Sequence, residues 1–78
     1  MNLIYSKQAV KVINSLDVPT KIRIKEHIER IPDGDIKPMR GYSDGRKRLR
    51  VGKYRVIFIE NGSELFFIDI GSRGDVYK

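Results

Sequence analysis

The chain has 78 residues, which we interpret as one domain, residues 1–78, with a thin core. It has no cysteine, which excludes a disulfide framework and a thiolate metal site, and its one histidine, His27, provides no convincing metal-ligand set. No apolar run approaches the roughly 18 residues that span a bilayer, and residues 1–5 do not resemble a signal peptide. We therefore expect a cytoplasmic protein with no membrane partner.

The positive charge is concentrated in one segment. The formal net charge is +6, but residues 37–55 carry eight basic side chains and one acidic one, whereas the other 59 residues carry eight basic and nine acidic ones. Such a segment is expected to meet phosphates, because non-specific affinity for nucleic acid comes mainly from contacts of this kind. The alternative is a basic face that only keeps the protein in solution.

The first half of the chain predicts one strand and two helices. Residues 2–5 form a β-prone run before Ser6, a good helix N-cap, and apolar residues then recur at helical spacing over 7–16. Asp17 and Pro19 predict the start of a second helix that extends to Pro32. Its apolar positions are Ile22, Ile24, Ile28 and Ile31. Two amphipathic helices joined so tightly predict an antiparallel hairpin.

The second half predicts an irregular segment and three strands. Proline, glycine and aspartate recur over residues 32–45 and indicate a loop. The period then changes to two over 46–51, 54–60 and 64–70, with Asn61-Gly62 as a hairpin signal. The expected order is β-α-α-β-β-β, an α+β fold in which an antiparallel sheet packs against a helical hairpin.

The last two predicted strands are apolar in both alternating sets of side chains. Ile57 and Ile59 alternate with Val56 and Phe58, and residues 64–70 behave similarly. A sheet covered by helices on one face would leave the second apolar set exposed. Two interpretations stay open: a partner covers that set, or the loop after the second helix shields it.

The basic segment suggests chemistry without acid–base carboxylates. Alternation places Arg46, Arg48 and Arg50 on one face of their strand, and no pair of carboxylates is placed for proton transfer. Cations and a tyrosine suit attack of an RNA 2′-hydroxyl on the adjacent phosphate, because the nucleophile belongs to the substrate. The protein would hold the in-line geometry, neutralise charge on the phosphorane and protonate the leaving oxygen.

Two blocks of sequence resemble the RelE/ParE toxin superfamily of type II toxin–antitoxin systems, and within it the RelE-like branch. They are RKRLRVGKYRVIF, residues 46–58, and IDIGSRGDVY, residues 68–77. The predicted order of elements resembles that fold over essentially the whole chain. The resemblance implies an endoribonuclease that cleaves mRNA on the ribosome, contacts 16S rRNA, uses no metal or other cofactor and is restrained by a cognate antitoxin.

The resemblance also implies residue roles. Arg55 aligns with an arginine against the scissile phosphate, Arg73 with a residue that stabilises the transition state or aids the leaving group, and Tyr77 with a tyrosine that stacks on or orients the nucleotide. Together with Arg48 they form the predicted catalytic group. The predicted RNA-binding residues are Arg46, Lys47, Arg50 and Lys53.

The chain departs from the family pattern at Arg46 and Arg48, where RelE-like enzymes commonly carry lysine. Arginine does not give up its proton and so cannot serve as the general base. Lys47, Lys53 and Tyr77 are the candidate replacements; otherwise cleavage rests on positioning and charge.

Other interpretations remain for the residues and for the protein. Arg55 could pair with Asp69 across the sheet, and Arg73 and Tyr77 could be loop and tail residues without function. The whole chain could be a ParE-like toxin that inhibits DNA gyrase without a nuclease site. It could also be a nucleic-acid-binding module of a toxin–antitoxin repressor complex.

Overall fold

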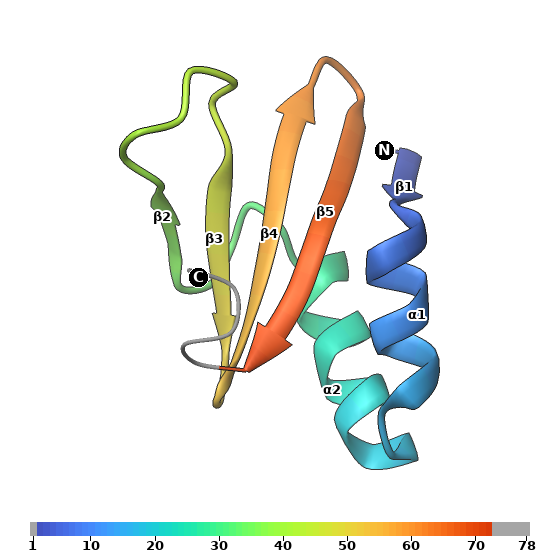
Figure 1. The fold of residues 1–78 in the computed structure, drawn as a ribbon. Helices are drawn as coiled ribbons and strands as arrows, with labels where there is room; N and C mark the ends of the chain where they lie inside the picture. The colour runs from blue at the N-terminus through green and yellow to red at the C-terminus, as the bar shows by residue number, and fades with distance from the viewer. Residues whose placement is uncertain (1, 73–78) are drawn as a thin grey trace.

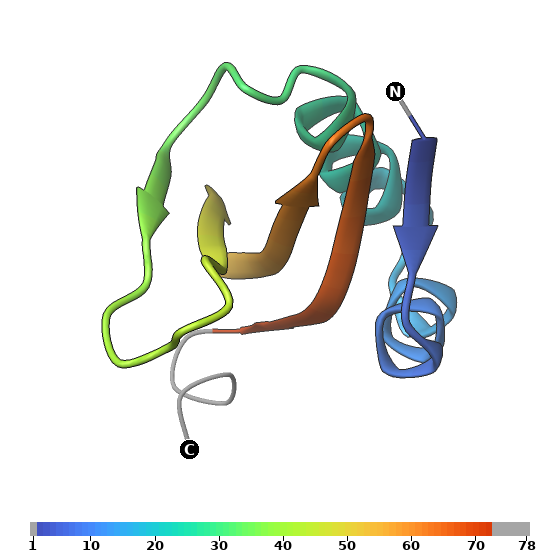
Figure 2. The ribbon, with the colours of Figure 1, turned by 90° about the horizontal axis from the view of Figure 1, so that it is seen from above.

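The computed structural model describes residues 2–72, which form one five-stranded sheet with two helices on one side of it (Figures 1 and 2). The sheet order is β1-β5-β4-β3-β2. The elements are β1 (Asn2–Tyr5), α1 (Lys7–Ser15), α2 (Val18–Glu29), β2 (Ile36–Pro38), β3 (Lys47–Val51), β4 (Tyr54–Asn61) and β5 (Glu64–Ser72). The predicted α+β architecture is confirmed.

Both helices begin at the predicted caps. The Ser6 hydroxyl accepts a hydrogen bond from the backbone N–H of Ala9 at 3.0 Å, and the Asp17 carboxylate accepts one from Thr20 at 3.3 Å. These bonds satisfy N–H groups that a helix start leaves without a partner. Across residues 2–72, neither helix has the length and apolar character needed to cross a bilayer.

The core lies between the helices and the sheet. Ile22 does not join it, because it precedes Ile24 by two residues and so lies on another side of α2, where it is 52% exposed. The buried residues in contact are Ala9, Ile13, Ile24, Ile28, Leu49, Val51, Val56, Phe58, Leu65, Phe67 and Ile70. α1 therefore packs chiefly on β5 and α2 faces β3.

The sheet is mixed, which corrects the expectation of a wholly antiparallel one. The three pairs β2–β3, β3–β4 and β4–β5 are antiparallel, but β1 pairs with β5 in parallel, with Leu3 beside Leu65. β1 and β5 lie at opposite ends of the described chain. No short turn connects them, so the sequence contains no hairpin signal that would indicate whether they pair in parallel or antiparallel.

β2 was not predicted and adds a strand to the expected order. It has three residues inside a segment rich in glycine and proline, and it ends at Pro38. Proline is tolerated there because β2 is an edge strand, where a missing N–H leaves no ladder bond unmade. Ile36 is half-buried and packs against the core, and this single apolar residue was the only sequence signal.

A β-bulge breaks the predicted alternation in β5. Ile57 pairs with Asp69 but Phe58 pairs with Phe67, so Ile68 has no direct partner on β4. Phe67 and Ile70 therefore both face the core although they are three residues apart. Ser6 holds this bulge, since its hydroxyl donates to the Ile68 carbonyl at 2.6 Å and its N–H donates to the Phe67 carbonyl at 2.9 Å.

The second apolar set of side chains is partly buried and partly exposed. Ile57, on the face away from the helices, is only 2% exposed, with Arg48 as its neighbour on β3. Phe66, which pairs with Ile59, remains 41% exposed. The monomer therefore covers the part of this face near the arginines and leaves the part near β1 open.

Candidate nucleic-acid interface

Four cations lie on the face of the sheet turned away from the helices. Leu49 and Val51 of β3 point into the core, so Arg48 and Arg50 point to the opposite side. The strand register places Arg55 of β4 directly opposite Arg50, and Lys37 of β2 directly opposite Arg48. We call Lys37, Arg48, Arg50 and Arg55 the basic face.

Two features of the basic face favour an anionic ligand. Arg50 and Arg55 are direct cross-strand neighbours, and side chains in that relation have Cβ atoms about 4.5–5.5 Å apart. Like charges held so close destabilise a sheet, and a bound anion relieves their repulsion. A phosphate is the anion that matches the planar fork of a guanidinium.

Arg48 provides the more specific signal. Its side chain is half-buried, and its Nε is buried without a hydrogen-bond partner among the described residues. A buried donor left in this state costs free energy that a well-placed acceptor recovers. Phosphate oxygens are strong acceptors, so Arg48 is suited to bind one at the floor of the basic face.

Arg46 does not join the basic face as the alternation predicted. It precedes β3, and its Nη2 lies 2.7 Å from Oδ2 of Asp44, while its Nε lies 3.2 Å from both carboxylate oxygens. Its guanidinium also lies over the Tyr42 ring, 4.1 Å from the centroid. The hydrogen bond from Arg46 holds the pKa of Asp44 below its usual value, and the same bond raises the pKa of Arg46.

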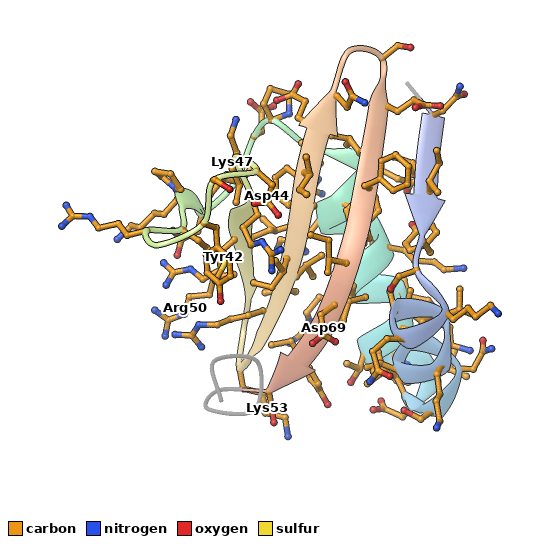
Figure 3. All side chains as sticks on the ribbon, turned by 45° about the horizontal axis from the view of Figure 1, so that its top comes forward. Tyr42, Asp44, Lys47, Arg50, Lys53 and Asp69 are labelled. Carbon is orange, nitrogen blue, oxygen red and sulfur yellow. The ribbon has the colours of Figure 1, made fainter. Side chains whose placement is uncertain are left out.

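The two lysines predicted to bind RNA also lie off the basic face. Lys47 shares the parity of Leu49 and pairs with Glu60 at 3.4 Å. Lys53 lies in the β3–β4 turn with its ammonium 5.5 Å from the Tyr54 ring centroid, and Figure 3 shows it at the end of the hairpin, away from Tyr42 and Asp44. Neither lysine is placed beside Arg48 to take up a proton there.

Asp69 is not the direct cross-strand neighbour of Arg55. That neighbour is Gly71, whereas Asp69 lies opposite Ile57. Oδ1 of Asp69 accepts a hydrogen bond from the Ile70 N–H at 2.9 Å, and the residue lines a cleft of about 440 Å³ between α1 and the ends of β4 and β5. The register therefore makes Asp69 a diagonal neighbour of Arg55, and the alternative in which the two side chains pair across the sheet stays a prediction.

Two predicted catalytic residues, Arg73 and Tyr77, lie outside the described residues. Their roles stay predictions that depend on the resemblance. The structure thus brings together Arg48, Arg50 and Arg55, and it gives Arg46, Lys47 and Lys53 other surroundings.

A cleft of about 330 Å³ beside Arg48 was missed at the level of sequence. It is lined by Pro38, Met39, Arg40, Tyr42 and Arg48. The sequence held one signal, an aromatic residue inside a glycine- and proline-rich segment flanked by arginines. That signal could not predict a cleft while β2 was unknown, because the edge strand brings residues 38–42 alongside β3.

The comparisons with known proteins give matches to solved structures but none to family models or curated proteins. Among solved structures, the RelB–RelE antitoxin–toxin complex from Methanococcus jannaschii contains a chain that is 28% identical, with a TM-score of 0.77, and the match covers 95% of this chain and 94% of that one. The archaeal RelE–RelB complex from Pyrococcus horikoshii OT3 matches at 26% identity and a TM-score of 0.74, over 95% and 96% of the two chains.

A third solved structure, the YoeB dimer from Staphylococcus aureus, is 15% identical with a TM-score of 0.75, over 88% of this chain and 92% of that one. At that identity the likeness concerns the fold alone. The matches from Methanococcus jannaschii and Pyrococcus horikoshii are to RelE–RelB complexes, and they do not favour the ParE-like alternative.

Proposed function

We propose that this chain, which belongs by its fold to the RelE-like toxins, is the toxin of a type II toxin–antitoxin system and cleaves mRNA on the ribosome. Two fold neighbours, at 28% and 26% identity, were solved as complexes of RelE with RelB. The observation that carries the proposal is the half-buried Arg48, whose buried Nε lacks an acceptor among the described residues and lies among like charges.

The chemistry assigns each cation of the basic face a task. Arg48 and Arg55 neutralise the charge that develops on the phosphorane as the 2′-hydroxyl attacks the adjacent phosphate. Arg50 and Lys37, both exposed, bind flanking phosphates and set the register of the RNA. Holding the 2′-oxygen, the phosphorus and the leaving oxygen in line provides the remaining acceleration.

Of the three groups that the sequence analysis considered for proton transfer, the two lysines are set aside. Arginine cannot take the proton from the 2′-hydroxyl, and Lys47 and Lys53 are engaged away from the basic face. Tyr77 is therefore assigned proton transfer or nucleotide stacking, and Arg73 is assigned the leaving group. The acceleration by Arg48 and Arg55 comes from positioning and charge, with no metal or cofactor.

The proposed partners follow from the same surface. A cognate antitoxin with acidic side chains would complement the basic face, and apolar side chains of that antitoxin would cover Phe66, which is 41% exposed beside Ile59. In the active state the partner is mRNA in a ribosome, with contacts from Arg50 to 16S rRNA. The site of action is the cytoplasm.

Incubation of the purified protein with programmed ribosomes tests the proposal. Wild-type protein should cut the message and leave a 2′,3′-cyclic phosphate, whereas Arg48→Ala and Arg55→Ala should cut it at least about 100-fold more slowly. Arg30→Ala is the matched control, because Arg30 is an exposed arginine at the end of α2. Intact message with wild-type protein would refute the nuclease.

Salt dependence separates binding from chemistry. Arg50→Ala should reduce the slope of log affinity against log salt by about 1, as expected for one lost phosphate contact. Lys47→Ala serves as its control, because Lys47 is paired with Glu60 on the other side of the strand. A protein that binds RNA with the full slope but cuts no message would be a nucleic-acid-binding module.

A further inference from the structure

One exposed aromatic ring beside the basic face is held in a fixed position. Tyr42, in the loop between β2 and β3, is 44% exposed. The Arg46 guanidinium lies 4.1 Å from the centroid of its ring, and Asp44 holds that guanidinium through both Nε and Nη2. Figure 3 shows Tyr42 and Asp44 on the side of the molecule away from α1. A single exposed tyrosine needs no explanation, but one fixed by an ion pair is ordered before any ligand arrives.

The ring also borders the cleft that Arg48 lines. Among the described residues, those around this cleft of about 330 Å³ include Tyr42, Arg40 and Arg48 but not Arg46. Tyr42 thus lines the cleft, and the Arg46 guanidinium that contacts its ring is not among the described lining residues. The volume lies near the lower end of the range of about 300–1,000 Å³ that is typical of small-ligand sites.

The residues that line the cleft match the base and the phosphate of a nucleotide. An aromatic ring stacks on any nucleobase, because every base has a π-face, and arginines bind phosphate. Arg48 supplies the buried Nε that lacks an acceptor among residues 2–72, and Arg40 adds an exposed cation. No acidic side chain lies among the described residues that line the cleft.

We propose that this cleft binds one nucleotide of a single-stranded RNA, with its base stacked on Tyr42 and the adjacent phosphate at Arg48. The proposal rests on the proposed function and assigns the substrate a base-stacking subsite. It also gives Arg46 a task that fits its contacts: paired with Asp44, it holds the Tyr42 ring in place through the contact of its guanidinium with the ring. Tyr42 is then a binding residue and Arg46 a positioning residue.

Binding of an uncleavable oligonucleotide tests the subsite without the ribosome. The probe is a short single-stranded RNA with 2-aminopurine next to a 2′-deoxy step, whose fluorescence falls when the base stacks. Wild-type protein should quench it, and Tyr42→Phe should behave like wild type because the ring is kept. Tyr42→Leu should lose the quenching and bind about tenfold more weakly.

The salt slope separates stacking from charge. Tyr42→Leu should leave the slope unchanged, because no cation is removed, whereas Arg50→Ala should lower it. If Tyr42→Leu unfolds, the wild-type protein is instead compared on oligonucleotides with and without a base at the probe position. Equal affinity for the two, unchanged quenching by Tyr42→Leu, or no binding by wild-type protein would overturn the subsite.

The same measurements distinguish this proposal from the function on which it rests. If ribosome-bound message stays intact while Tyr42-dependent quenching persists, the nuclease fails and the nucleotide subsite stands. If the message is cut equally by wild-type protein and Tyr42→Leu and no quenching occurs, the subsite fails and the nuclease stands.

Discussion

The two faces of β3 differ sharply in burial and charge. Leu49 is fully buried against the helices, with 0% exposure, while the adjacent Arg48 lies on the opposite side with a buried Nε that lacks an acceptor among the described residues. The same strand therefore stabilises the fold with one set of side chains and offers charge with the other. Because the sets alternate, substitutions at consecutive positions should affect stability and activity separately.

Arg48→Ala is expected to have the largest effect on activity. Cleavage on programmed ribosomes should fall about 100-fold to 1,000-fold, as when one preorganised donor to a developing negative charge is removed. The melting temperature should stay within a few degrees of wild type, because the variant also removes a buried donor that lacks an acceptor among residues 2–72. Arg48→Lys, which keeps the charge and loses the fork, should recover only part of the rate. A strongly lowered melting temperature with normal cleavage would reverse the roles assigned to the two faces.

Leu49→Ala, one residue away, should have the opposite effect. Loss of a fully buried leucine from the core should reduce the free energy of unfolding by about 2–5 kcal/mol, measured by urea denaturation. Cleavage per folded molecule should remain near the wild-type value, because Leu49 points away from the basic face. Ile22→Ala is the control, since Ile22 is 52% exposed and should cost far less. Equal losses at positions 22 and 49 would contradict the packing described.

Ser6→Ala should produce an intermediate loss on the helix side of the sheet. The hydroxyl caps α1 and also donates to the bulge carbonyl of Ile68, so the substitution should cost about 1–2 kcal/mol of stability. Ser15→Ala removes an exposed hydroxyl that donates only to the Val12 carbonyl, and it should cost less. The comparison is made by thermal or urea denaturation, and a larger effect at Ser15 would show that the bulge does not depend on Ser6.

The smallest expected effect is a pH dependence in the loop before β3. Arg46 lowers the pKa of Asp44 in the folded protein, so this pair stabilises the fold at pH values above the unfolded pKa of about 3.9. That contribution is lost as the pH falls through the lower, folded pKa. Wild-type protein should be slightly more stable than Asp44→Asn at pH 6, and the difference should shrink below about pH 4. A difference that grows on acidification would contradict the sign of the shift.

Features governed by local rules could be predicted from the sequence. Ser6 and Asp17 cap their helices as expected, and the Asn61-Gly62 turn joins β4 to β5 with Gly62 at φ 62°. The alternation that turns Arg48 and Arg50 away from the core was also foreseen, because it depends only on the period of a strand.

Features governed by distant contacts could not be predicted. The parallel pairing of β1 with β5 depends on how the ends of the sheet meet, and the bulge at Ile68 depends on a hydroxyl 62 positions earlier in the sequence. Arg46 follows the same alternation as Arg48, but it precedes the strand and a nearby carboxylate draws it toward the loop. The cleft beside Tyr42 required β2, which is too short to leave a periodic pattern.

The two-residue connection between β3 and β4 determines which residues of the two strands lie opposite each other. Gly52 adopts a φ of 60°, which only glycine adopts readily, and the register that follows sets Arg55 across from Arg50. One extra amino acid in this turn would shift the pairing by a step and send Arg55 toward the helices. Insertions and deletions can thus be tolerated in the long connection before β3. They cannot be tolerated in this turn, because its length determines which face of the sheet Arg55 occupies.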